Sequence, residues 1–237
     1  MNMKNADLMK KARMVLQGKW GEVLLASAIV QAVSFGFSGV QTLLGSGKEN
    51  ISLSATALVC FAALIAFFIE TPLDFGFARY GLSAARREPL SFDRLLYGFS
   101  RWGAAIGATI LICVFCMLWS VLLIVPGILA ALSYSMTFYV MMDDENISPM
   151  DAIRKSKKMM YGHRLRFLCF CLRYIGWWLL SMLPYLIVLI IFGEEHAFLC
   201  NLLMYAGLVP VVAYFGVGTA TFYDDLKASQ NPEIPTP

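Results

Sequence analysis

Four polar side chains lie inside long apolar segments of this sequence and are the residues best placed to do chemistry. They are Glu70, Asp74, Tyr134 and Arg173. An ionisable group inside a membrane span costs roughly 3 kcal/mol on insertion scales, and such groups often carry function. Asp74 follows Glu70 by one helical turn. We therefore treat these four residues as a candidate intramembrane polar site.

The spacing of the charged residues suggests that two of them could pair. Glu70 lies nine residues before the basic boundary at Arg79, and Arg173 lies nine residues after the one at Arg164. Both are therefore expected at about 13 Å from the same membrane surface. One hypothesis is a buried Glu70–Arg173 ion pair. In the alternative, Arg173 extends toward the interface and Glu70 caps a kink at Pro72.

No motif for catalysis, nucleotide binding or metal binding accompanies these side chains. The chain contains no Gly-x-Ser-x-Gly, His-Glu-x-x-His or P-loop sequence. All six cysteines lie in apolar stretches, and even Cys113 and Cys116, which have a metal-like spacing, lack polar neighbours. We expect them to be packing residues. The sequence predicts no enzyme activity, no metal site and no cofactor.

The composition is that of a membrane protein. Hydrophobic residues make up 59% of the 237 residues and charged residues 15%, and the mean hydropathy is +0.66. Soluble domains carry about 25% charged residues, so burying this much apolar surface requires lipid. The net charge is +3, and no basic patch stands apart from the apolar segments. A nucleic-acid partner is therefore not expected.

Six apolar segments are long enough to cross a bilayer, which needs about 20 residues of helix. The predicted fold is an all-α membrane protein with about six transmembrane helices. The junction between the third and fourth segments contains Pro126 and Gly127 and no polar linker. Two interpretations are open there, a tight hairpin turn or a discontinuous helix that lines a site. The predicted segments are Trp20–Leu44, Ile51–Ala78, Trp102–Val125, Pro126–Met142, Arg166–Phe192 and Ala197–Tyr223.

The distribution of basic residues predicts the orientation. Of the 19 Lys and Arg residues, 17 lie in the N-terminal segment, the C-terminal tail and the two loops after spans two and four. The exceptions are Lys48, in an alternate loop, and Arg173. Basic loops stay on the cytoplasmic side, so both termini are expected in the cytoplasm.

The basic segments resemble one another and divide the chain into three units. Each is an amphipathic stretch that reaches a glycine, at Gly18, Gly98 or Gly162, a few residues before the next span. We predict short interfacial helices that end at these glycines, each followed by a transmembrane hairpin. The units cover 1–82, 83–145 and 146–226, and 227–237 is a flexible tail. Residues expected to contact lipid headgroups are Arg86, Arg87, Lys155, Lys157, Lys158 and His163.

Several short motifs carry a resemblance to a known family. They are Leu122–Ile128, Ala131–Met136, Ala152–Ser156, Met160–His163 and Phe222–Leu226. These motifs resemble those of a bacterial integral membrane protein family of unknown function, domain of unknown function family 975. The resemblance covers nearly the whole chain, with departures at Tyr161 and Arg173, and it implies the bacterial cytoplasmic membrane but no activity. More distantly, the chain resembles the membrane domains attached to some glycerophosphodiesterases, which hints at lipid.

These observations favour a non-enzymatic membrane module that engages lipid or a small amphiphile. Its expected partners are membrane lipids, together with a possible membrane protein. One alternative is a small-solute transporter, which requires a polar cavity near the four intramembrane residues. The other is a structural subunit that stabilises a larger membrane complex.

Overall fold

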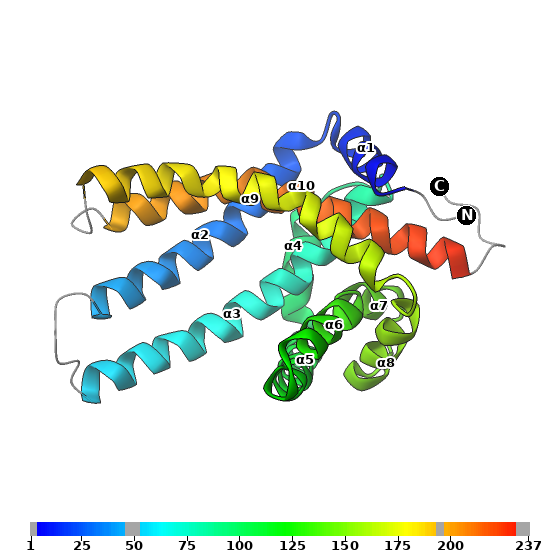
Figure 1. Cartoon of the computed structure of the whole chain (residues 1–237), viewed down its shortest axis with the longest axis horizontal. Coiled ribbons are helices and arrows are strands. Elements are labelled where there is room, and N and C mark those ends of the chain that lie inside the picture. Colours follow the sequence, from blue (N-terminus) through cyan, green and yellow to red (C-terminus); the bar gives the residue numbers. More distant parts are fainter. Residues whose placement is uncertain (1–3, 46–52, 193–196, 231–237) are drawn as a thin grey trace.

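The computed structural model describes residues 4–45, 53–192 and 197–230, and in these ranges every regular element is an α-helix (Figure 1). This confirms the all-α prediction. Glu194, Glu195 and His196 lie outside the described residues. The helices are α1 (Asn5–Leu16), α2 (Trp20–Gly45), α3 (Leu53–Ala85), α4 (Phe92–Ser100), α5 (Trp102–Leu122), α6 (Ile124–Tyr134), α7 (Thr137–Asp143), α8 (Pro149–Met159), α9 (Arg164–Phe192) and α10 (Ala197–Gln230).

Six stretches among the described residues are long and apolar enough to cross a membrane, as predicted. In chain order, each short amphipathic helix, α1, α4 or α8, comes directly before a pair of spans. The spans α2, α3, α9 and α10 extend in one direction from the short helices, whereas the α5–α6 hairpin is strongly foreshortened in the same view (Figure 1). The spans are Trp20–Val40, Thr56–Ala85, Trp102–Leu122, Ile124–Asp143, Arg164–Ile191 and Phe198–Gln230.

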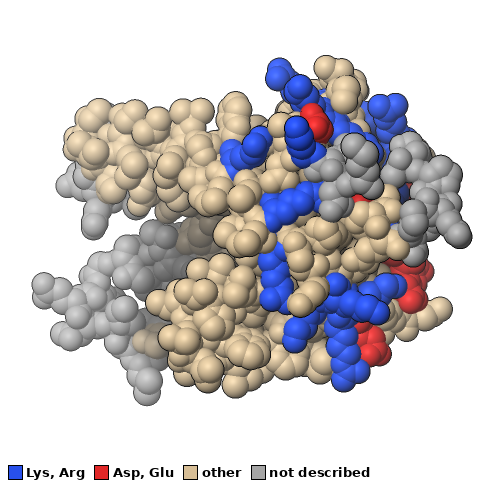
Figure 2. All heavy atoms as spheres, turned by 45° about the vertical axis from the view of Figure 1, so that its right-hand side comes forward, with Lys and Arg blue, Asp and Glu red and all other residues tan. Residues whose placement is uncertain are grey.

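Lys and Arg side chains gather over one side of the molecule, and none is seen on the projecting ends of the apolar helices in this view (Figure 2). We call this side the basic end; it comprises α1, α4 and α8 and the ends of α3, α7 and α10 that contact them. The α3 helix has 33 residues and α10 has 34. At 1.5 Å per residue each is about 50 Å long, whereas the hydrocarbon core is about 30 Å thick. Both helices are therefore long enough to reach beyond the bilayer.

The junction between the third and fourth spans is a tight turn. Leu123 alone separates α5 from α6 and has an extended backbone. Pro126 falls in the first turn of α6, where a missing N–H breaks no helical hydrogen bond. A Cβ on Gly127 would lie 2.2 Å from the Ser120 Oγ, so the two helices approach closely beside the turn. This geometry agrees with the tight hairpin turn, one of the two interpretations that the sequence left open at this junction.

The fourth span is broken at a different place from the Pro-Gly pair. Residues 135 and 136 form a turn between α6 and α7. Hydroxyl groups satisfy carbonyls around this break: Ser135 Oγ donates to Leu132 at 2.8 Å, and Thr137 Oγ1 donates to Tyr134 at 2.7 Å. Such bonds let a helix break inside an apolar environment without leaving backbone carbonyls unpaired.

Two glycines bring α4 into backbone contact with α3. A Cβ on Gly98 would lie 1.7 Å from the Pro72 carbonyl oxygen, and a Cβ on Gly76 would lie 1.7 Å from that of Leu95. Gly98 lies inside α4, which continues to Ser100. The prediction that Gly98 ends this helix is therefore wrong, because the glycine serves close packing there. Gly18 and Gly162 do follow helix ends, with φ of 87° and 80°.

The neighbouring span also satisfies the carbonyl that Pro72 leaves without a helical hydrogen bond. Proline has no N–H, so the carbonyl four residues earlier, that of Phe68, loses its helical partner. The Trp102 Nε1 donates a hydrogen bond to this carbonyl at 3.1 Å. This hydrogen bond also joins α5 to α3.

The last helix reaches further than the sequence suggested. Leu226 is buried, the Lys227 Nζ donates to Asp143 at 2.7 Å, and the Gln230 Nε2 donates to the Met159 carbonyl at 3.2 Å. These contacts hold the first four residues of the predicted tail in α10. Residues 231–237 lie outside the described residues.

The α3–α4 contact yields a stability prediction. Replacing Gly98 by Ala should force the two helices apart and lower the free energy of unfolding by about 1–3 kcal/mol. The control is Gly103→Ala, because a Cβ there meets nothing within 4 Å. We expect the control to be neutral or slightly stabilising. Thermal unfolding in a mild detergent compares them, and equal melting temperatures for both variants would contradict the close contact.

Candidate functional site

The structure separates the four intramembrane residues that the sequence grouped together. Glu70 is half-buried on α3 and lines a cavity, whereas Asp74 is exposed and is not among the residues that line it. Arg173 is exposed on α9. Among the described residues no ion pair joins Glu70 to Arg173, so the pairing hypothesis finds no support. The exposure of Arg173 fits the alternative in which this side chain extends toward the interface.

Tyr134 belongs to a different site. It is buried on α6 and lines a cavity of about 220 Å³ where α5, α6, α8 and α9 meet. Lys157 and Arg164 line the same cavity, together with Trp119. An intramembrane residue and a predicted headgroup residue, Tyr134 and Lys157, thus come together at one location. We call this the Tyr134 cavity.

The predicted headgroup contacts divide into two kinds. Arg87, at the end of α3, is exposed, and His163 is half-buried. Lys155, Lys157 and Lys158 are exposed on the outer face of α8, whose inner face buries residues that include Ile153 and Met159. These side chains are free to reach headgroups. Arg86 is not, because the protein itself binds its guanidinium.

Arg86 lies at the centre of a charged cluster that joins three helix ends. Its Nη2 atom lies 3.0 Å from Asp143 Oδ1 at the end of α7 and 2.8 Å from Asp224 Oδ1 on α10. Asp143 Oδ2 also accepts from the Tyr223 hydroxyl at 2.6 Å and from the Lys227 Nζ at 2.7 Å. We call these five residues the Arg86 junction. It connects the end of α3 to the ends of the other two hairpins.

The electrostatics of the junction favour charged forms. Burial by itself would lower the pKa of Arg86, but the hydrogen bonds and charges of Asp224 and Asp143 outweigh it and raise this pKa above its ordinary value. Only 11% of the Asp143 side-chain surface is exposed. A half-buried arginine held by two carboxylates suits a structural role, because its Nε and Nη2 atoms are already bonded to the protein.

Further ion pairs secure the same end of the molecule. Arg166 Nη2 lies 2.5 Å from Asp225 Oδ2. Arg79 Nη1 lies 3.1 Å from Glu145 Oε1 and its guanidinium carbon lies 3.6 Å from the centre of the Tyr97 ring. The Tyr97 hydroxyl donates to Glu145 at 2.7 Å, and this bond, aided by Arg79, lowers the pKa of the Glu145 carboxyl.

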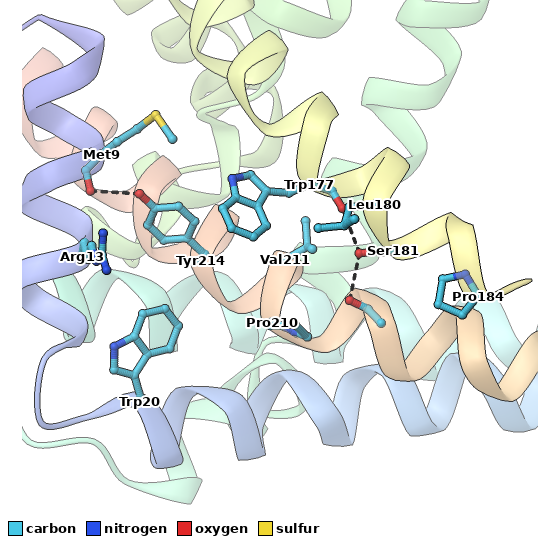
Figure 3. A pocket seen from close by; sticks show the side chains of 11 residues that line it. Met9, Arg13, Trp20, Trp177, Leu180, Ser181, Pro184, Pro210, Val211 and Tyr214 are labelled. Carbon is cyan, nitrogen blue, oxygen red and sulfur yellow. Dashed lines mark hydrogen bonds between the residues drawn. The ribbon is translucent and has the colours of Figure 1, made fainter.

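A groove of about 550 Å³ opens between α1, the start of α2, α9 and α10 (Figure 3). We call it the Arg13 groove. Its walls are largely apolar and aromatic, with prolines on both long helices. The residues that line it are Met9, Arg13, Trp20, Trp177, Leu180, Ser181, Pro184, Gly207, Pro210, Val211 and Tyr214.

The groove has one polar and one apolar end. Arg13, Trp20 and Tyr214 lie together at one end, and Pro184 lies at the other (Figure 3). The Tyr214 hydroxyl donates to the Met9 carbonyl at 3.1 Å, so α1 is attached to α10 at the polar end. Further along, the Ser181 hydroxyl bonds the Trp177 and Gly207 carbonyls, each at 2.9 Å. The apolar end therefore offers a ligand little hydrogen bonding.

Sequence reasoning did not find this groove. It named none of these residues as a binding site, and it used Trp20 as the start of the first predicted span. One signal was present: Ser181 and Gly207 each precede a proline, Pro184 and Pro210, by three residues. A small residue before a proline on each of two neighbouring spans favours close approach followed by divergence.

His, Cys, Asp and Glu are the side chains that could hold a metal ion. In residues 4–45, 53–192 and 197–230, no three His, Cys, Asp or Glu side chains are grouped as metal ligands. The described residues do form the Arg13 groove and the cavities around Tyr134 and Glu70.

These features define a multi-pass membrane protein built from six candidate spans. Residues 120–230 match the family model described as protein of unknown function (DUF975). The match confirms the family resemblance over that part of the chain. Neither a curated protein nor a solved structure matches the chain.

The Arg86 junction can be tested by removing its shared carboxylate. Asp143→Asn should lower the free energy of unfolding by about 1–3 kcal/mol, because Arg86 and Lys227 both lose a charged partner in a partly buried cluster. The matched control is the neighbouring exposed residue, Asp144→Asn, which should stay within about 0.5 kcal/mol of the wild type. Thermal unfolding in detergent measures both, and an equal loss in the two variants would rule out a special role for Asp143.

Proposed function

We propose that this protein is a non-enzymatic module of the bacterial cytoplasmic membrane that binds a lipid, or a similar amphiphile with an anionic headgroup, in the Arg13 groove. The observation that carries the proposal is the groove itself, which combines a cationic mouth with long apolar walls. Its volume of about 550 Å³ lies in the range of small-molecule sites. The family match supplies no activity, so the proposal rests on the site.

The polar end suits an anionic headgroup. Arg13 is exposed, and among the described residues it takes part in no ion pair. A guanidinium binds phosphate or carboxylate oxygens with two parallel hydrogen bonds. Trp20 and Tyr214 flank it with ring centres 6.5 Å apart. Such amphipathic rings favour the level of the headgroups, where one edge is apolar and the other is wet.

The apolar end suits an acyl chain. Leu180, Pro184, Pro210 and Val211 line the groove between α9 and α10. The hydroxyl of Ser181 is already hydrogen-bonded to two carbonyls, so it does not require a hydrogen bond from a ligand. Each buried methylene contributes roughly 0.8 kcal/mol, so a chain laid along this wall would add binding energy without polar contacts.

The predicted orientation supports a headgroup site at the inner leaflet. The basic end carries nearly all Lys and Arg residues, and the positive-inside rule assigns such a side, with both termini, to the cytoplasm. The cytoplasmic leaflet is rich in anionic lipids, to which each nearby Lys or Arg adds about 1 kcal/mol of attraction. The exposed lysines of α8 would contribute to the same attraction without forming a site.

A structural role in a larger membrane complex is the alternative from another class. The tip of the α5–α6 hairpin exposes large apolar side chains, with Val121 at 83% and Ile124 at 76%. A lipid environment would cover these side chains, and so would a partner's spans. A stoichiometric protein partner without a retained lipid would favour this alternative.

The lipid proposal predicts specific loss of a bound amphiphile. Wild-type protein purified in a mild non-ionic detergent should retain an anionic lipid near one per chain in native mass spectrometry. Arg13→Gln should lower this occupancy about tenfold, as expected for losing a charge-assisted bidentate contact. The control, Lys10→Gln, removes a charge from the same helix at an exposed position outside the groove and should change occupancy less than about twofold.

A second variant tests the apolar end independently. Leu180→Trp should fill the groove and displace the chain while leaving Arg13 in place. The proposal would be refuted if the wild type, Arg13→Gln, Lys10→Gln and Leu180→Trp all retained equal amounts of lipid with mixed headgroups.

A further inference from the structure

We propose that the cavity around Glu70 is a binding site for a small organic cation, such as a protonated or quaternary amine. The cavity has a volume of about 400 Å³ and lies where α2, α3, α9 and α10 meet, inside the predicted spans. This inference is independent of the lipid proposal. The lining residues are Gln31, Ser34, Phe37, Ser38, Ala66, Glu70, Trp178, Tyr205, Leu208 and Val212.

The cavity and the Arg13 groove lie on different faces of the α9–α10 pair. Trp177 lines the groove and its neighbour Trp178 lines the cavity. In the same way, Val211 lines the groove and Val212 lines the cavity. Adjacent residues of a helix point in directions about 100° apart. The two sites are therefore distinct, and a ligand of one does not occupy the other.

One face of α2 supplies polar groups to the cavity. Gln31, Ser34 and Ser38 are spaced by three and four residues, which places them on a single helical face. They lie in a span that is apolar enough to cross a membrane. Polar side chains inside a span are expensive and usually face a protein interior or a polar cavity. Here they face the cavity that also contains Glu70.

The charge of the cavity is negative. Glu70 is half-buried, and within the described part of the chain it forms no ion pair. Asp74 lies one turn further along α3 but is exposed and does not line the cavity. The lining residues include no Lys or Arg. A carboxylate inside a span is stabilised by a positive ligand, because the cation offsets the loss of water.

The aromatic lining selects an organic cation over a metal ion. Phe37, Trp178 and Tyr205 line the cavity together with the carboxylate. Ring faces attract ammonium groups, and cages of aromatic residues recognise quaternary amines. Divalent ions such as Ca²⁺ prefer six or more oxygen ligands with several carboxylates, whereas this lining contains one. The volume also exceeds what a single dehydrated ion fills.

Choline and its neutral carbon analogue, 3,3-dimethyl-1-butanol, provide the test because they share size and shape and differ in charge. Equilibrium dialysis of the full chain in non-ionic detergent should show saturable binding of choline and at least about tenfold weaker binding of the alcohol. Glu70→Gln should weaken choline binding by about tenfold or more. The matched control, Asp74→Asn, removes the same charge from the same helix outside the cavity and should weaken it less than about threefold.

Ser34→Leu is a second variant that keeps Glu70 but fills the cavity, and it should also abolish choline binding. Where Glu70→Gln fails to fold, the comparison of Ser34→Leu with the wild type decides. Equal binding of choline and the alcohol, or equal losses in Glu70→Gln and Asp74→Asn, would overturn the proposal. Lipid retention by the Glu70→Gln variant is measured in parallel. An unchanged lipid occupancy would show that the loss of choline binding does not come from damage to the Arg13 groove.

Discussion

The architecture depends on how Arg86 and Asp143 hold the hairpins together at the basic end. Spans in a bilayer gain little from hydrophobic association with each other, because lipid is as apolar as their side chains. Something else must fix their arrangement. Arg86 at the end of α3 reaches Asp143 at the end of α7 and Asp224 on α10. Tyr223 and Lys227 complete the cluster. These charge-assisted bonds join three hairpins where water and headgroups tolerate charge.

Close backbone contacts extend this arrangement into the apolar region. Gly98 and Gly76 let α4 touch α3, and Trp102 supplies the hydrogen bond that Pro72 removes from the Phe68 carbonyl. On the other side, Ser181 on α9 bonds the Gly207 carbonyl on α10. Each contact uses a small residue or a freed carbonyl, since these allow helices to associate without a hydrophobic driving force. The α9–α10 pair formed in this way separates two sites of opposite character.

The two sites follow from this packing. The Arg13 groove places a cation at the mouth of an apolar channel near the basic end, whereas the Glu70 cavity places a carboxylate among aromatic and hydroxyl groups inside the spans. A protein with both could respond to lipid at one site and to a polar cation at the other. The Arg13 groove relates to the lipid-engaging interpretation of the sequence. The Glu70 cavity contains only one of the four residues near which the transporter alternative required a polar cavity.

Local features of this protein were determined by the sequence alone. The six spans and the helix ends before Gly18 and Gly162 follow from hydropathy and backbone restrictions that act over a few residues. At Pro126 the sequence left a hairpin turn and a discontinuous helix both open. Glu70 was recognised as unusual because a carboxylate inside a span is costly.

The sequence could not say that Gly98 packs rather than ends a helix, because that depends on where Pro72 lies. Only the tertiary structure decided that Glu70 faces Ser34 and Trp178 rather than Arg173, and that Arg13 meets Tyr214. Depth along a span can be counted from residues, but the rotation of each helix toward its neighbours is set by contacts between distant segments.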